Sequence, residues 1–184
     1  MSEATSPALS GPIQRTFFYY AGASAVGLVA ITTTSLVDGA FVGNYVGAHA
    51  LAAISLLIPC FTVLYAVALM FAIGGSVYAG QHIGAGDADA ASDVFSQTLL
   101  ATLAVAVLFA LGSSALEAPL LRALSVPSQL APLASEYLGV IRWVFVVQLT
   151  TMVLYYFVRA DGHPLLATGA LVTGAATNVA FNAW

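Results

Sequence analysis

Between Arg15 and Asp87 the chain carries a single charged side chain, Asp38, and most of the residues around it are apolar. Over all 184 residues 60% are hydrophobic and only 7% are charged, and the mean hydropathy is +0.96. These proportions are typical of proteins whose solvent is a lipid bilayer. The sequence therefore predicts an all-α, polytopic transmembrane helix bundle.

Five stretches of the sequence are long and apolar enough to cross a bilayer, which takes about 20 residues of helix. They run from about residue 17 to the Asp38 region, from about 50 to beyond 73, from about 94 to 116, from about 137 to 158, and from 164 onward. We expect a tail over residues 1–14, followed by a transmembrane lobe over residues 15–184.

The first two connectors have the chemistry of tight turns. The turn after the first span is expected within residues 43–49, which contain Gly43 and Gly47, and Gly84 and Gly86 mark the turn after the second. Asp87 follows at a position where its carboxylate can cap the next helix. A direct contact between Asp87 and a substrate is the alternative.

The later connectors and one internal proline also carry predictions. Residues 117–132 suit an interfacial loop with a short helical piece. Residues 159–164, with Arg159 at the start and Gly162 inside, are expected to form a solvated hairpin. Pro59 lies within the second span, where it removes one backbone donor and favours a kink.

Composition excludes several classes of function. Lysine is absent and the formal net charge is −4, so the chain offers neither a nucleic-acid surface nor a polybasic lipid-binding segment. Its four cationic residues are too few to set the orientation in the membrane. Its single cysteine and its scattered histidines form no metal motif, and no nucleophile stands with a base. We therefore expect no catalytic residue, no metal, no cofactor and no enzymatic activity.

Asp38 is the main candidate for a functional residue. A charge near the centre of a bilayer costs at least ~2.5 kcal/mol, so such residues usually face a bundle interior or a wet cavity. Thr34 and Ser35 precede Asp38 by four and three residues, so the three side chains share one helix face. Two alternatives stay open: the helix continues past Asp38, or it ends near Val37 and leaves Asp38 hydrated at the interface.

Polar side chains also cluster in the fifth span. Asn178 and Asn182 are four residues apart and share a face, with Thr177 beside them. Unpaired amides are costly in hydrocarbon, so we expect them to contact another helix, either in a binding site or as simple interhelical hydrogen bonds. Gly169 and Gly174 would allow a close approach between helices.

Several sequence blocks, taken in order, resemble a known family. They are LVDGAFVG at 36–43, GAGD at 84–87, SEYL at 135–138 and RADGHP at 159–164. Their order and spacing resemble the first five helices of multidrug and toxic compound extrusion (MATE) transporters. The resemblance implies a fold of twelve helices in two six-helix lobes, of which this chain supplies an incomplete first lobe.

The same resemblance implies a function and a location. Members of the family move drugs or organic cations outward across the cell membrane by proton or sodium antiport, and their amino terminus is cytoplasmic. The implied partners are the substrate, the lipid bilayer, the sixth helix and the second lobe. A non-transporting fragment or assembly subunit is one alternative, and a flippase for lipids or oligosaccharides is another.

The resemblance also adds detail to the candidate site. One branch of the family has an aspartate where this chain has Asn182, which cannot titrate, so Asp38 is the only acid of that pair. Tyr137 matches a family tyrosine near this network, although a tyrosine at the start of a span is often an interfacial anchor. Gln148, the polar residue deepest in the fourth span, is a further candidate. Many members have a proline where this chain has Ala23.

Overall fold

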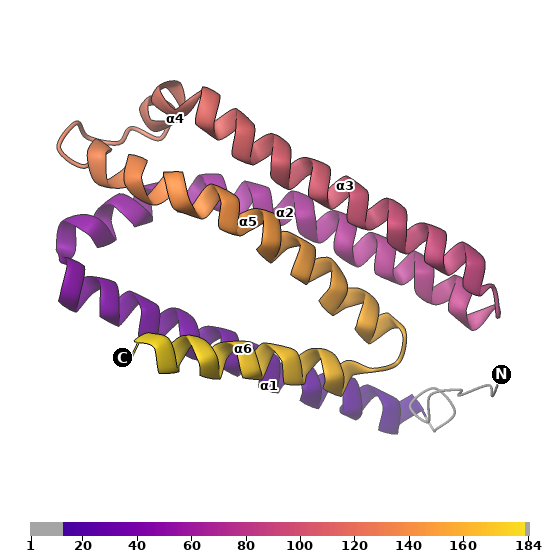
Figure 1. Cartoon of the computed structure of the whole chain (residues 1–184). Helices are drawn as coiled ribbons and strands as arrows, with labels where there is room; N and C mark the ends of the chain where they lie inside the picture. The colour runs from indigo at the N-terminus through magenta and orange to yellow at the C-terminus, as the bar shows by residue number, and fades with distance from the viewer. Residues whose placement is uncertain (1–12, 183–184) are drawn as a thin grey trace.

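The computed structural model describes residues 13–182, and the regular structure in this part of the chain is helical throughout (Figure 1). The elements are α1 (Ile13–Phe41), the π-helix η1 (Val42–Val46), α2 (Ala48–Gly84), α3 (Ala88–Ala115), α4 (Glu117–Ala123), α5 (Ala131–Ala160) and α6 (Pro164–Asn182). Five helices are long and apolar enough to cross a membrane, with η1 continuing the first of them. The predicted all-α transmembrane bundle is confirmed. Most of the predicted tail over residues 1–14 lies outside the described residues.

The helices extend beyond the predicted spans at several ends. The second helix runs on to Gly84, and the fourth long helix begins at Ala131 rather than near residue 137. Hydropathy detects the part of a helix that lies in hydrocarbon, whereas the backbone hydrogen bonds continue into the interface. The short helix α4 lies within residues 117–132, where the sequence predicted a helical piece.

Two turns depend on residues that the sequence identified. The Asp87 carboxylate accepts a hydrogen bond from the backbone N–H of Ala90 at 3.0 Å, which caps α3. Gly86 and Gly162 have φ angles of +78° and +87°, a region in which glycine is strongly favoured. Gly84, in contrast, is the last residue of α2 and not part of the turn.

The first turn lies at the second of its two glycines. Gly43 lies inside η1, and the chain reverses at Gly47, whose φ angle is +106°. The wider π-helical hydrogen bonding carries the helix on for one more turn, and the Gly47 N–H donates to the Val42 carbonyl at 3.0 Å. The chain thus turns within the predicted residues 43–49, but at Gly47, whereas Gly43 itself is helical. Pro59 does not end α2, which continues through it.

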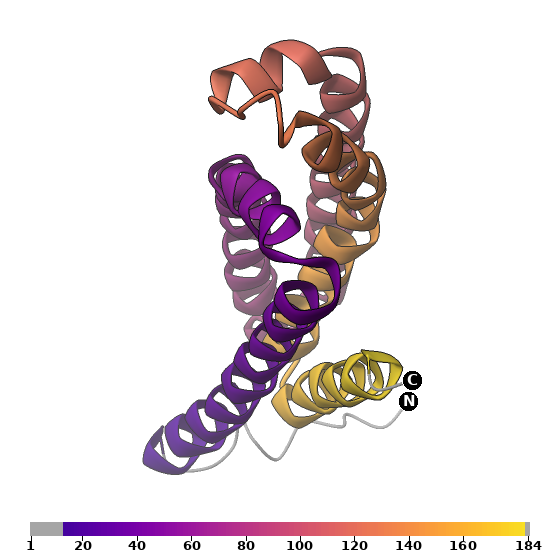
Figure 2. The ribbon, with the colours of Figure 1, turned by 90° about the vertical axis from the view of Figure 1, so that its left-hand side faces the viewer.

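The long helices form two groups, visible in Figures 1 and 2. Helices α2, α3 and α5 pack against one another, and we call them the α2–α3–α5 group. Helices α1 and α6 pack mainly against each other and form the α1–α6 pair. The core of the first group combines small and branched side chains. Among its most buried members are Ala53, Leu57, Ala68, Ala106, Leu138 and Leu149.

Small residues determine where helices approach closely. A Cβ atom at Gly75 of α2 would lie 2.2 Å from the Thr98 Oγ1 atom of α3, so this contact requires glycine. On α6 one of the residues that contact α1 is Thr168, whose hydroxyl donates to the Ala23 carbonyl at 3.1 Å. Gly169 and Gly174 have no atom within 4 Å of an added Cβ. Among residues 13–182 no helix therefore packs closely against these two glycines, and their role in a close helix contact stays a prediction.

A buried ion pair joins α4 to α5. Arg142 is only 4% exposed, and its guanidinium contacts the Glu117 carboxylate and donates from Nε to the Leu138 carbonyl at 2.8 Å. The Ser135 hydroxyl also donates to Glu117. Hydrogen bonds from Ser135 and Arg142 lower the pKa of the Glu117 carboxyl below its ordinary value. The pair keeps a charge inside the α2–α3–α5 group without leaving it uncompensated.

Candidate functional site

Asp38 lies inside α1, which continues to Phe41. The alternative in which the helix ends near Val37 is therefore wrong. From α6, the Asn182 side-chain nitrogen donates to Asp38 Oδ1 at 2.7 Å and to Asn178 Oδ1 at 3.1 Å. The structure thus brings together Asp38, Asn178 and Asn182, which the sequence singled out on two helices that are far apart along the chain.

The negative charge of Asp38 has no cationic partner among residues 13–182. Its hydrogen-bond donor, the Asn182 amide, is neutral and contacts one of the two carboxylate oxygens. Asp38 also lies close enough to Tyr137 of α5 for an electrostatic interaction between the two side chains. An anion with neutral partners retains the capacity to bind a cation.

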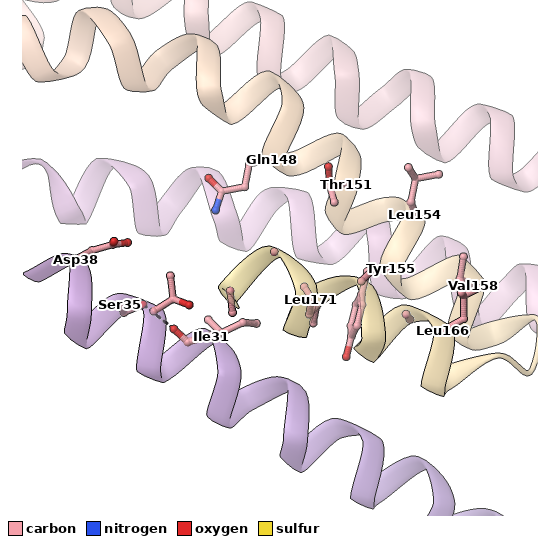
Figure 3. Close-up of a pocket in the computed structure, with 15 residues that line it drawn as sticks. Ile31, Ser35, Asp38, Gln148, Thr151, Leu154, Tyr155, Val158, Leu166 and Leu171 are labelled. Atoms are coloured by element: carbon pink, nitrogen blue, oxygen red, sulfur yellow. Dashed lines mark hydrogen bonds between the residues drawn. The ribbon is translucent and has the colours of Figure 1, made fainter. Parts of the chain in front are cut away.

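Asp38 borders a cavity of about 550 Å³ between α1, α5 and α6 (Figure 3). Most of the lining is apolar, and the polar lining residues face one another from α1 and α5. The lining residues are Ile31, Thr34, Ser35, Asp38, Gln148, Thr151, Leu154, Tyr155, Val158, Leu166, Ala167, Ala170, Leu171, Gly174 and Ala175. A largely apolar cavity of this volume with a few polar groups is typical of small-molecule sites.

The hydroxyl groups beside Asp38 are partly committed to their own helix. Thr34 donates to the Ala30 carbonyl at 3.0 Å, and Ser35 donates to the Ile31 carbonyl at 3.1 Å. Their hydrogens are therefore occupied, whereas their oxygen lone pairs face the cavity as acceptors. Together with the Asp38 carboxylate they make the α1 wall a surface that accepts hydrogen bonds.

The remaining candidates differ in position. Gln148 lines the cavity. Tyr137 does not, and its ring lies 6.3 Å from the ring of Phe61, centroid to centroid. Thr177 is exposed, and its hydroxyl donates to the Thr173 carbonyl at 2.8 Å. The structure therefore brings Gln148, but not Thr177, to the cavity. Among residues 13–182 no group of three or more His, Cys, Asp or Glu side chains could hold a metal ion.

Arg159 does not belong to a solvated hairpin, and the prediction for this residue is wrong. Its guanidinium donates to the Tyr155 hydroxyl at 2.8 Å and to the Ser24 hydroxyl of α1 at 2.7 Å. The guanidinium carbon also lies 5.2 Å from the Tyr155 ring centroid and 5.8 Å from that of Tyr20. These are distances at which a cation is attracted to an aromatic face. Arg159 thus holds the first half of α1 against the end of α5.

The sequence reasoning missed two polar lining residues, Thr151 and Tyr155. The signal was present in their spacing, because Gln148, Thr151 and Tyr155 follow one another by three and four residues and so share one face of α5. Tyr155 belongs both to the cavity lining and to the contacts of Arg159.

Comparison with known proteins gives a consistent assignment. The family model MatE matches residues 23–184. The chain is 34% identical over 131 residues to an FAD transporter from Shewanella oneidensis, covering 71% of this chain and 28% of that protein. It is 21% identical over 168 residues to the multidrug export protein MepA from Staphylococcus aureus, covering 91% of this chain and 37% of that protein. The chain therefore spans well under half the length of these relatives.

Solved structures show the same fold. A transporter of the MOP superfamily from Pyrococcus furiosus, described as having a binding pocket of reverse polarity, matches with a TM-score of 0.86 at 24% identity. A multidrug resistance MATE transporter of that superfamily in an outward-facing conformation matches with a TM-score of 0.85 at 25% identity. Each match covers 95% of this chain, but only 38% and 39% of the other chain. With the family model matching most of its length, the chain belongs to the MatE family and is a multi-pass membrane protein.

Proposed function

We propose that Asp38 is the cation-binding centre of an exporter that moves drugs or organic cations in exchange for protons or sodium ions. The observation that carries this proposal is the Asp38 carboxylate, which pairs with a neutral amide and borders a 550 Å³ cavity. In a membrane such an acid is a functional candidate by default. The similarity of this chain to a multidrug export protein supports the same proposal.

Competition for one negative charge would couple the two movements. When Asp38 holds a proton or a sodium ion, the cavity has no net charge to attract an organic cation. When the coupling ion leaves, the carboxylate regains its charge and binds the substrate. Asn182 and Asn178 keep the carboxylate in place through their hydrogen bonds but cannot themselves titrate. Antiport follows, because the site cannot hold both cations at once.

The lining of the cavity favours a cationic substrate. Asp38 is the only charged side chain among the lining residues, and the walls around it are mainly apolar. A flat or bulky apolar cation would gain both charge neutralisation and apolar contact. A dinucleotide such as the cargo named for the Shewanella oneidensis relative carries phosphate charges of the same sign as Asp38. We therefore propose organic cations rather than anionic nucleotides.

The proposed transport involves more protein than these residues. Alternating access works by moving two repeats around a central site, and this chain spans only 28% to 37% of the relatives it matches. We propose that further helices, corresponding to the rest of those relatives, complete the cavity in the cell membrane, with the amino terminus in the cytoplasm.

Binding of tetraphenylphosphonium by the 184-residue chain in lipid nanodiscs tests the proposal. We expect Asp38→Asn to weaken binding at least tenfold, because one charge interaction in a partly dry site exceeds the roughly 1.4 kcal/mol that a tenfold change requires. The coupling ion, proton or sodium, should compete with this binding in the wild-type chain, and Asp38→Asn should remove that competition. Asp93→Asn, an exposed acid of α3, is the control. Unchanged binding in Asp38→Asn would contradict the proposal.

The uncovered face of α6 favours a second candidate, a non-transporting helix-bundle subunit. Gly169 is exposed and has no atom within 4 Å of an added Cβ, so another helix could pack closely against it. Such a subunit should bind tetraphenylphosphonium equally well with and without Asp38.

In liposomes with a pH or sodium gradient, we expect no dye efflux from this chain alone. Gradient-driven efflux would show that copies of this chain assemble a complete pathway.

A further inference from the structure

We propose that Gln148 determines specificity in the cavity by donating a hydrogen bond to an acceptor group on the bound cation. This inference rests on the proposed binding of cations at Asp38 and adds a second recognition point on the opposite wall. Figure 3 shows the Gln148 side chain pointing from α5 into the space between α5 and α1. Both Gln148 and Asp38 line the same cavity.

Most of the hydrogen-bond donors that line the cavity already have partners. The hydroxyl hydrogens of Thr34, Ser35 and Thr151 are all directed to carbonyls of their own helices. Asp38 is an acceptor. Among the polar lining residues this leaves two uncommitted sources of hydrogen, the Gln148 amide and the Tyr155 hydroxyl, whose oxygen accepts from Arg159.

Gln148 is the more versatile of these two groups. Its side chain makes no hydrogen bond to any residue between 13 and 182, so both hydrogens and the carbonyl oxygen are available. The Tyr155 hydroxyl is held by the Arg159 guanidinium, and its oxygen lies 3.7 Å from the Cβ position of Gly27 on α1. Tyr155 is therefore fixed between helices, whereas Gln148 is free to turn toward a ligand.

The position of Gln148 within α5 gives its unpaired amide a bearing on ligand binding. It lies near the middle of α5, which spans Ala131–Ala160 and is apolar enough to cross a membrane. An amide without a partner is costly in hydrocarbon. A cavity that holds water, and then a ligand, removes that penalty.

Two-point recognition follows from these positions. The positive centre of the ligand binds the Asp38 carboxylate on α1. An acceptor such as a carbonyl or ether oxygen, placed away from that centre, binds the Gln148 amide on α5. Cations without an acceptor bind through charge and apolar contact alone. The cavity thus favours organic cations that carry a hydrogen-bond acceptor over those that do not.

A matched pair of ligands isolates the hydrogen bond. One is tetraphenylphosphonium with an acetyl group on one ring, and the other carries an isopropyl group of similar shape without an acceptor. We expect the wild-type chain in nanodiscs to bind the acetyl compound about fivefold more tightly, the ratio that one net hydrogen bond confers. Gln148→Met should reduce this ratio to about one, because the methionine side chain has a similar length but no N–H donor.

Further variants distinguish this inference from the proposed function. Gln148→Asn keeps an amide and should retain part of the preference. Gln97→Met, at an exposed glutamine of α3, should retain all of it. If Gln148→Met weakens both compounds equally, or if the preference survives in it, the inference is wrong. If Asp38→Asn leaves the binding of both compounds unchanged, the proposed function itself fails.

Discussion

The α2–α3–α5 group and the α1–α6 pair differ in how the charge that each contains is compensated. In the first, Arg142 is 4% exposed and its charge is neutralised by Glu117, with further hydrogen bonds from Ser135 and to the Leu138 carbonyl. In the second, Asp38 pairs with a neutral amide and borders a cavity. One charge is compensated within the described residues, and the other is not.

The difference separates a structural charge from one that is free to act. A buried pair with full hydrogen bonding holds a helix in place, and removing one partner destabilises the fold strongly. A charge with neutral partners depends less on its neighbours for stability and is available to an incoming ion. Helix α1 fits this division, because only 6% of its most apolar 18-residue stretch is buried, against 28% of the corresponding stretches of α2 and α5.

The largest expected effect comes from breaking the compensated pair. Glu117→Ala leaves the Arg142 guanidinium buried without a counter-charge, and we expect it to lower the free energy of unfolding by about 3 kcal/mol. The measurement is equilibrium unfolding in mixed detergent micelles, followed by circular dichroism.

Two variants show whether that loss reflects the pair itself. Replacing both partners, as in Glu117→Leu with Arg142→Met, should restore most of the stability, because an apolar pair of similar size carries no desolvation penalty. Asp38→Asn should change stability by less than about 1 kcal/mol, because an amide oxygen can still accept from Asn182. A loss in Asp38→Asn as large as in Glu117→Ala would remove the contrast between the two helix groups.

Glycine packing gives an intermediate effect with opposite signs in the two groups. Gly75→Ala places a Cβ against Thr98 and should destabilise by about 1–3 kcal/mol. Gly169→Ala meets no atom within 4 Å and should be neutral or stabilising by up to about 1 kcal/mol, as alanine favours helix. Unfolding of both single variants and of Gly75→Ala with Thr98→Ala, which should recover stability, checks this. Equal losses at both glycines would show that α6 is as closely packed as α2.

The smallest expected effect is a dependence on pH. The folded state lowers the pKa of Glu117, so the pair contributes its full stability above the unfolded value of about 4.3 and loses it as pH falls through the folded pKa. Stability should stay level from pH 7 to 5 and fall below about pH 4. The Glu117→Leu, Arg142→Met variant lacks this contribution, and its curve should be flatter. Identical curves would show that Glu117 does not titrate with folding.

Much of the fold could be predicted because each signal is local. Hydropathy over about 20 residues gives the spans, and the Asp87 cap depends on atoms only three residues apart. The grouping of Asp38 with Asn178 and Asn182 required the family resemblance as well. Helical spacing places polar groups on one face but does not say which helix that face meets.

What could not be predicted depends on tertiary contact. The residues that follow Arg159 have the composition of a turn. Its partner Ser24 lies on α1, so this contact is known only once the packing of α1 is known. From the sequence, Gly43 and Gly47 are equally suitable as turn residues. The hydrogen bonds of the π-helix η1 place Gly43 inside the helix and Gly47 at the turn. Gly169 and Gly75 look alike in sequence, yet only one faces a neighbouring helix.

The contacts between α1 and its partners also bear on how the protein is made. The hydrogen bonds from Tyr20 to Arg159, from Arg159 to Ser24, from Thr168 to Ala23 and from Asn182 to Asp38 join residues 139, 135, 145 and 144 positions apart. At a synthesis rate of about 5–20 residues per second, the second partner appears on the order of ten seconds after the first. Helix α1 must therefore wait in the bilayer while α2 to α5 assemble, and the Asp38 network is among the last parts of this chain to form.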